Sequence, residues 1–130
     1  MIFVDTNYFL RFLLKDVAAQ HSEVRELFYQ GAAGEVELFS STVVFFEIYW
    51  VLESVYGKHR HELVSVLEKV LQMQFIWIDG RKLLESALVV FAKSSVSLED
   101  AYNVVYARSR KAIKFATFDK KLQKQFHLLS

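Results

Sequence analysis

Short hydrophobic runs alternate with longer amphipathic stretches along this chain. Five runs have the length and residue types of β-strands: Ile2–Asp5, Val36–Ser40, Phe75–Ile78, Phe115–Thr117 and, more weakly, His127–Leu129. Helical spacing of the apolar residues between them predicts helices over Thr6–Lys15, Ala18–Gln30, Thr42–Tyr56, His61–Gln72, Arg81–Lys93 and Leu98–Lys111, and another that starts at Lys120. Alternating strands and helices predict an α/β fold, with a mainly parallel sheet of four to five strands covered by helices on both faces.

The composition narrows the class of protein. A chain of 130 residues with 53% hydrophobic residues predicts one compact domain over residues 1–130. The absence of Cys excludes disulfides and thiolate metal sites. No apolar run reaches the roughly 20 residues of a membrane span, and the start of the chain lacks the features of a signal peptide, so we expect a cytoplasmic protein without a membrane partner. The net charge of +1 neither requires nor forbids a nucleic-acid partner.

Glu47 is the most informative single residue, because the stretch around it offers almost no other polar side chain. On a helix its neighbours three and four residues away are apolar, namely Val43, Val44, Trp50 and Val51. The pattern therefore predicts a buried carboxylate, which needs a partner because an isolated buried charge is costly. That partner is either a basic side chain in the core or a bound cation.

Three further acids follow predicted strands or open predicted helices. Asp5 ends the first strand, and Asp119 follows Phe115–Thr117, so both lie beyond the carboxyl end of a strand, where ligand sites of such sheets gather. Asp100 opens a helix in the S-x-x-D pattern of a capping box with Ser97. Each of these acids has a structural interpretation as a helix cap, and a cap is compatible with binding a metal ion.

Four carboxylates at one rim would repel one another unless a divalent cation neutralised them. Oxygen ligands without Cys or paired His favour Mg²⁺ or Mn²⁺ over Zn²⁺. Mg²⁺ keeps several waters and binds phosphate oxygens, which points to phosphodiester chemistry with a metal-activated water as nucleophile.

At these residues the chain resembles the PIN domain family. The resemblance rests on Val4-Asp5-Thr6-Asn7, on Glu47, on Asp100-Ala101-Tyr102-Asn103 and on Thr117-Phe118-Asp119, in this order and spacing over essentially the whole chain. The opening stretch from Val4 to Leu14 and the compact length look most like VapC-type toxins of bacterial and archaeal toxin-antitoxin pairs.

The resemblance implies a three-layer α/β/α sandwich and an endoribonuclease dependent on Mg²⁺ or Mn²⁺. It also implies a homodimer held inactive by a cognate antitoxin protein. The family's acidic roles in catalysis and metal binding carry over onto Asp5, Glu47, Asp100 and Asp119, with Thr6, Asn7 and Thr117 as hydrogen-bonding support. Many relatives carry a further acid soon after the last Asp, where this chain has Lys120 and Lys121, which leaves open whether one or two metal ions bind.

The basic residues around Asp119 have two interpretations, a solvated surface or a track for an RNA backbone. They are Lys111, Lys114, Lys120, Lys121 and Lys124. The four His residues show no zinc-type spacing. A haloacid-dehalogenase-like hydrolase would need an Asp where this chain has Asn7, which makes that alternative weak. A catalytically silent PIN-fold module that binds protein or RNA is the stronger alternative.

Overall fold

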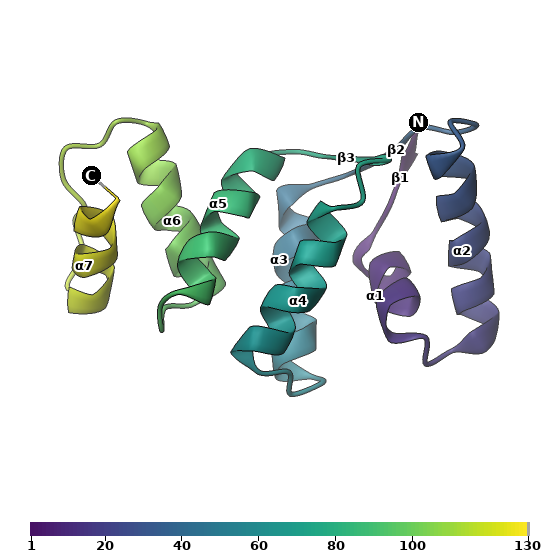
Figure 1. Cartoon of the computed structure of the whole chain (residues 1–130), viewed down its shortest axis with the longest axis horizontal. Helices are drawn as coiled ribbons and strands as arrows, with labels where there is room; N and C mark the ends of the chain where they lie inside the picture. Colours follow the sequence, from purple (N-terminus) through teal and green to yellow (C-terminus); the bar gives the residue numbers. More distant parts are fainter. Residues whose placement is uncertain (130) are drawn as a thin grey trace. The chain divides into compact units, whose positions relative to one another are not determined.

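A computed structural model describes residues 1–129, with three strands and seven helices (Figure 1). The chain forms two compact units, unit 1 over Met1–Gly80 and unit 2 from Arg81 onward. Unit 1 contains β1 (Ile2–Phe3), α1 (Thr6–Leu14), α2 (Ala18–Ala32), β2 (Leu38–Ser40), α3 (Thr42–Ser54), α4 (Arg60–Leu71) and β3 (Ile76–Ile78). Unit 2 contains α5 (Arg81–Ala92), α6 (Leu98–Ser109) and α7 (Lys120–Leu128).

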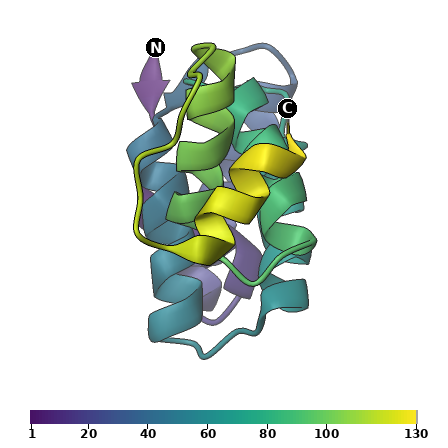
Figure 2. The same ribbon diagram turned by 90° about the vertical axis from the view of Figure 1, so that its left-hand side faces the viewer.

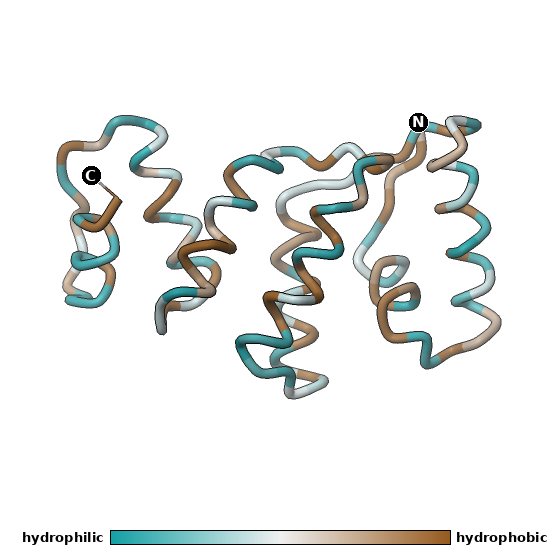
Figure 3. Tube along the Cα trace, viewed as in Figure 1, coloured by the Kyte–Doolittle hydropathy of each residue, from teal (hydrophilic) through white to brown (hydrophobic). Residues whose placement is uncertain are grey.

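The sheet of unit 1 is parallel throughout, with the strand order β1-β2-β3. Its strands are largely hydrophobic (Figure 3). The register pairs Ile2 with Leu38 and Leu38 with Ile76. The Ser40 hydroxyl donates a hydrogen bond of 2.8 Å to the Val4 carbonyl and so ties β2 to the end of β1. The predicted parallel α/β arrangement is confirmed for these three strands.

The two faces of this sheet differ in exposure. The connections from β1 to β2 and from β2 to β3 both step across the sheet in the same direction. Because connections between parallel strands are right-handed, the helices of both connections, α1 to α4, lie on one face of the sheet. Leu38 and Ile76 point to that face and are buried. Phe3 and Trp77 point to the other face with Phe39 between them, and they are 47% and 61% exposed. The Phe3 and Phe39 rings meet edge to face with centroids 5.3 Å apart. Unit 1 therefore supplies only one helical layer of the predicted sandwich.

The prediction of four to five strands is wrong for the described part of the chain. Phe115–Thr117 is irregular, and His127 and Leu128 lie in the last turn of α7. A strand needs a neighbouring strand for its backbone hydrogen bonds. In the part of unit 2 described, as far as Leu129, all of the regular elements are helices. Near the end of the chain, the burial of Leu122 and Phe126 at helical spacing favours α7.

Helix α3 forms the centre of unit 1. Ser41 caps it, because its Oγ accepts a hydrogen bond of 3.2 Å from the Val44 amide. Phe45, Ile48 and Leu52 lie along one side of the helix and are almost completely buried. Helix α1 packs against this helix and against α2, and α4 packs against it as well. The position of α3 therefore depends on one apolar stripe and one cap.

Gly31 of α2 packs closely against Leu38 of β2. A Cβ atom at this position would lie 3.0 Å from the Cγ of Leu38 and closer still to its Cδ1. We expect Gly31→Ala to destabilise the protein by about 1–2 kcal/mol, because overpacking a buried Leu outweighs the gain in helix propensity of about 1 kcal/mol. Chemical denaturation measures the change. Ala32→Gly on the exposed side of α2 is the control, and a stabilised Gly31→Ala protein would contradict the packing argument.

Unit 2 is held together by α6, which packs against both α5 and α7 (Figure 2). The Arg108 guanidinium lies 3.6 Å from the centre of the Phe126 ring and donates two hydrogen bonds, of 3.0 and 2.6 Å, to the Phe126 carbonyl. This contact joins the end of α6 to the end of α7. It therefore helps to fix the position of α7, the helix that Asp119 caps.

Within residues 1–129, none of the helices has the length and apolar character needed to cross a membrane.

Candidate metal centre

Asp5 lies directly after β1, where the chain turns into α1. The preceding residue, Val4, is 1% exposed, whereas the Asp5 side chain is exposed. Its Oδ1 accepts a hydrogen bond of 2.8 Å from the Thr6 amide, so the predicted helix cap is confirmed. Within residues 1–129 the carboxylate has no other hydrogen bond and no ion pair. One carboxylate oxygen is thus left for a ligand at the carboxyl end of the strand.

The Thr6 hydroxyl is an orphaned polar group beside this carboxylate. Thr6 is 6% exposed, and its Oγ1 has no hydrogen-bond partner in the described chain. Buried hydroxyls nearly always have a hydrogen-bond partner, so a hydroxyl without one indicates a place for a water molecule or an ion. Asn7 follows with an exposed side chain. The exposed Asp5 carboxylate and Asn7 amide therefore supply oxygen atoms at the start of α1, which fits a hard divalent cation.

Glu47 is exposed, and the prediction that it is buried is wrong. The core side of α3 is the opposite one, and Glu47 shares the outer side with Val43 and Trp50, which are 65% and 58% exposed. Within the described part of the chain Glu47 forms no ion pair, so a basic side chain in the core, one of the two predicted partners, is absent there. Glu47 is therefore available for a ligand.

We expect Glu47→Gln to leave the metal-free melting temperature unchanged, because an exposed carboxylate without a partner contributes less than about 0.5 kcal/mol. The affinity for Mn²⁺ should fall in the same protein if Glu47 helps to hold a metal ion. Melting curves in EDTA and isothermal titration calorimetry with Mn²⁺ test the two parts. Glu53→Gln, on the same helix, is the control for the metal affinity only, because the Glu53 carboxylate accepts a hydrogen bond of 3.2 Å from the Tyr49 hydroxyl. A strongly destabilised Glu47→Gln protein would mean that this side chain has a structural role.

Asp100 lies in the first turn of α6. Ser97 caps the helix, since its Oγ accepts a hydrogen bond of 3.1 Å from the Asp100 amide. Only half of the predicted capping box is present among the described residues, because the Asp100 carboxylate accepts no hydrogen bond from the Ser97 amide. The carboxylate is half-buried and makes no hydrogen bond or ion pair there. Glu99 beside it is exposed.

Asp119 caps α7, although no strand precedes it. Its Oδ1 accepts hydrogen bonds from the amides of Lys121 and Leu122, at 2.8 and 3.3 Å. Thr117 supports it in turn, because the Thr117 Oγ1 accepts a hydrogen bond of 3.1 Å from the Asp119 amide. The Gln123 side chain donates to the Phe115 carbonyl at 2.8 Å. Side-chain bonds therefore replace the strand pairing that the sequence predicts for Phe115–Thr117.

Each unit carries two of the four predicted acids. In unit 1, Asp5 caps α1 and Glu47 lies on the neighbouring helix α3. In unit 2, Asp100 lies on α6 and Asp119 caps the neighbouring helix α7. Within residues 1–129, no three Asp, Glu or His side chains gather closely enough to hold a metal ion by themselves. Convergence of all four acids on one ion stays a prediction.

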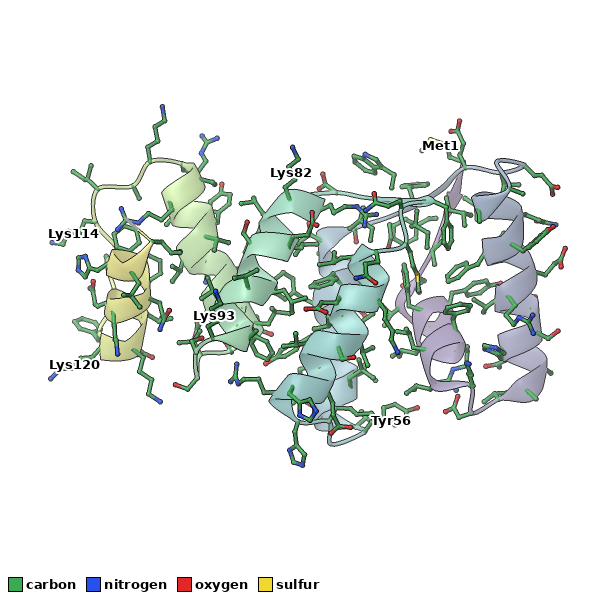
Figure 4. The ribbon with its side chains drawn as sticks, viewed as in Figure 1. Met1, Tyr56, Lys82, Lys93, Lys114 and Lys120 are labelled. Atoms are coloured by element: carbon green, nitrogen blue, oxygen red, sulfur yellow. The ribbon has the colours of Figure 1, made fainter. Side chains whose placement is uncertain are left out.

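The basic residues of unit 2 lie on either side of Asp119 along the chain. Lys111, Lys114, Lys120, Lys121 and Lys124 are all exposed, and none forms an ion pair with a described residue. The Lys114 and Lys120 side chains extend away from the ribbon at either end of the segment that leads into α7 (Figure 4). Their exposure is compatible with both interpretations, so a track for an RNA backbone stays a prediction.

One feature of unit 1 escaped the sequence analysis. A pocket of about 400 Å³ lies against Asn7, between α1 and α2. Its polar residues recur at helical spacing on the two helices, at Asn7 and Arg11 and at Gln20 and Glu23. Each of these residues taken singly looks like an ordinary surface residue. Only the pairing of α1 with α2 brings them to one place.

Comparison with known proteins gives one match. The family model of the PIN domain matches residues 2–126, through both units and all four predicted acids. No curated protein and no solved structure matches the chain. Because the matched stretch takes in nearly all of the 130 residues, the chain belongs to the PIN domain family.

Proposed function

We propose that this protein is a metal-dependent endoribonuclease and the toxin of a type II toxin-antitoxin pair. Proteins of the PIN family are in general metal-dependent nucleases. The observation that carries the proposal is the start of α1, where Asp5, whose carboxylate has a free oxygen, is followed in the chain by Thr6, whose buried hydroxyl has no partner among the described residues. Both groups lie within the matched residues, beyond the carboxyl end of a parallel strand.

A bound Mg²⁺ or Mn²⁺ would supply the charge that activates water and stabilises the pentavalent phosphorus of the transition state. Asp5, Glu47 and Asp100 would hold the ion, and Asp119 would complete the site or orient the water. Asp119 already uses Oδ1 to cap α7, so its other oxygen is the one available for this role. Thr117 keeps the turn at Asp119 in place through the backbone.

RNA is the proposed substrate because a flexible strand can enter an open acidic rim bordered by lysines, whereas a stiff duplex would have to bend. The exposed lysines of unit 2 would neutralise phosphates along the strand. Val43 and Trp50 on the outer side of α3 support the proposed homodimer, since exposed apolar residues on one helix side favour an interface. The antitoxin is a further proposed partner.

Cleavage of single-stranded RNA by the purified protein tests this function. We expect cuts in the presence of Mn²⁺ or Mg²⁺ and none in EDTA, with mapping of the cut ends giving the sequence preference. Protein with the Asp5→Asn change, purified in parallel, controls for contaminating nucleases. If a broad panel of RNAs stays intact with either ion, the catalytically silent binding module becomes the better account.

A further inference from the structure

The pocket between α1 and α2 is built almost entirely from polar side chains. It is lined by Asn7, Tyr8, Arg11, Gln20, Glu23 and Val24, and its volume is about 400 Å³. Pockets for small ligands have volumes of about 300–1,000 Å³, so a single nucleotide-sized group is an appropriate occupant. A lining with only one aliphatic residue does not suit a lipid or an apolar peptide side chain.

Arg11, one of the residues that line this pocket, is held by two contacts. Its Nη1 lies 3.1 Å from Asp16 Oδ1, and its Nη2 donates a hydrogen bond of 3.3 Å to the Tyr56 hydroxyl. The Tyr56 hydroxyl donates in turn to Asp16, also at 3.3 Å. This arrangement fixes the guanidinium and balances its charge locally. Recognition in the pocket therefore relies on hydrogen bonds more than on net charge.

The pocket begins within one helical turn of the proposed metal centre. Asn7 lies two residues after Asp5, and the Tyr8 amide donates a hydrogen bond of 3.1 Å to the Asp5 carbonyl. Arg11 is six residues beyond Asp5, which is about 9 Å along a helix axis. An RNA strand cut at Asp5 would therefore place a neighbouring nucleotide at this pocket.

We propose that this pocket binds the base of a nucleotide next to the cut phosphate and selects for a base that carries an exocyclic amino group. The proposal rests on the proposed ribonuclease function. Glu23 is an acceptor for amino protons, as carboxylates are when they bind the amino group of cytosine. Uracil lacks that group. The Gln20 and Asn7 amides supply both donors and acceptors for the remaining base atoms, and the Tyr8 ring offers a stacking surface.

Binding of single nucleotides to the metal-free protein tests the proposal. The four ribonucleoside 5′-monophosphates are titrated in EDTA into ¹⁵N-labelled full-length protein, and amide shifts are followed by NMR. We expect shifts at residues 7–11 and 20–24, with uridine monophosphate bound about tenfold more weakly than the best nucleotide. Glu23→Gln should reduce this difference to about twofold, since an amide both donates and accepts. Glu26→Gln, one turn further along α2 and outside the pocket, should keep it.

Absence of shifts at residues 7–11 and 20–24 with all four nucleotides would overturn the proposal. So would an unchanged preference in the Glu23→Gln protein. Because the measurement needs neither metal nor cleavage, its result is independent of the nuclease activity. If the protein cuts RNA but shows no shifts at this pocket, the base-selecting site is wrong and the proposed function stands. If it shows the expected shifts but cuts no RNA, the nucleotide-binding pocket stands and the proposed nuclease function is wrong.

Discussion

Asp100→Asn is expected to reduce the proposed RNA cleavage in Mn²⁺ by more than a hundredfold and to relieve the growth arrest that the proposed toxin function predicts for expression without an antitoxin. Loss of a residue that only supports a metal ligand already costs about 10- to 100-fold, so loss of a ligand should cost more. The fold should survive, because Ser97 caps α6 through the backbone amide of Asp100 and not through its carboxylate. A cleavage assay, a growth assay and a melting curve on the same protein measure the three effects.

Glu99→Gln is the matched control for this change. Glu99 lies next to Asp100 in the first turn of α6 and is exposed, so it loses a similar charge near the same helix end. It should keep both cleavage and toxicity. If Asp100→Asn cleaves RNA as fast as the wild type while Glu99→Gln is inactive, the assignment of the metal ligand is wrong.

Asp5→Asn should abolish binding of Mg²⁺ or Mn²⁺ to the purified protein, with little change in stability. An amide oxygen can still accept the hydrogen bond from the Thr6 amide, and Asn caps helices about as well as Asp. What the substitution removes is the negative charge that a divalent cation requires. Isothermal titration calorimetry with each ion compares the variant with the wild type.

Asp79→Asn provides the control for the calorimetry. Asp79 is exposed and follows β3, two strands from β1, which is about 10 Å across a sheet. It lies at the same carboxyl edge as Asp5 but should be too far away to bind the same ion directly. Equal metal affinity in the Asp5→Asn and wild-type proteins would remove Asp5 from the metal centre.

Local sequence signals predicted the starts of helices better than their ends. The start of α6 at Leu98 follows from the S-x-x-D pattern, in which Ser97 supplies the cap. Its end was predicted at Lys111 but lies at Ser109, and Lys111 itself adopts a left-handed conformation with φ 61°. Lys gives no sequence signal for this conformation, which Gly usually marks.

Long-range packing accounts for what the sequence could not predict about the fold. Phe115–Thr117 has the composition of a strand, but pairing needs a second strand beside it, and none lies in the described residues of unit 2. Helix α3 is apolar on both sides, so its periodicity could not tell whether Val44 and Ile48 or Val43 and Glu47 face the core. The mistake about Glu47 follows directly from this ambiguity.

The sequence predicted those residues of the candidate site that lie at the start of a helix. Asp5 and Asp119 were identified by their positions at the ends of β-like runs, and both cap the helices that follow. Asp100 was identified by its spacing from Ser97. Whether these acids meet depends on contacts between distant parts of the chain, which local patterns do not encode. The pocket beside Asn7 was missed for the same reason.

The two tryptophans give this protein two natural optical probes. Trp50 lies on the outer side of α3 and Trp77 on the aromatic face of the sheet, and both indole rings are more than half exposed. Burial of an indole shifts its fluorescence emission to shorter wavelength, so any partner that covers one of these surfaces changes the spectrum. Proteins with Trp50→Phe or Trp77→Phe each retain a single probe. Unlabelled protein can therefore reveal which of the two surfaces an antitoxin or a second copy of the chain occupies.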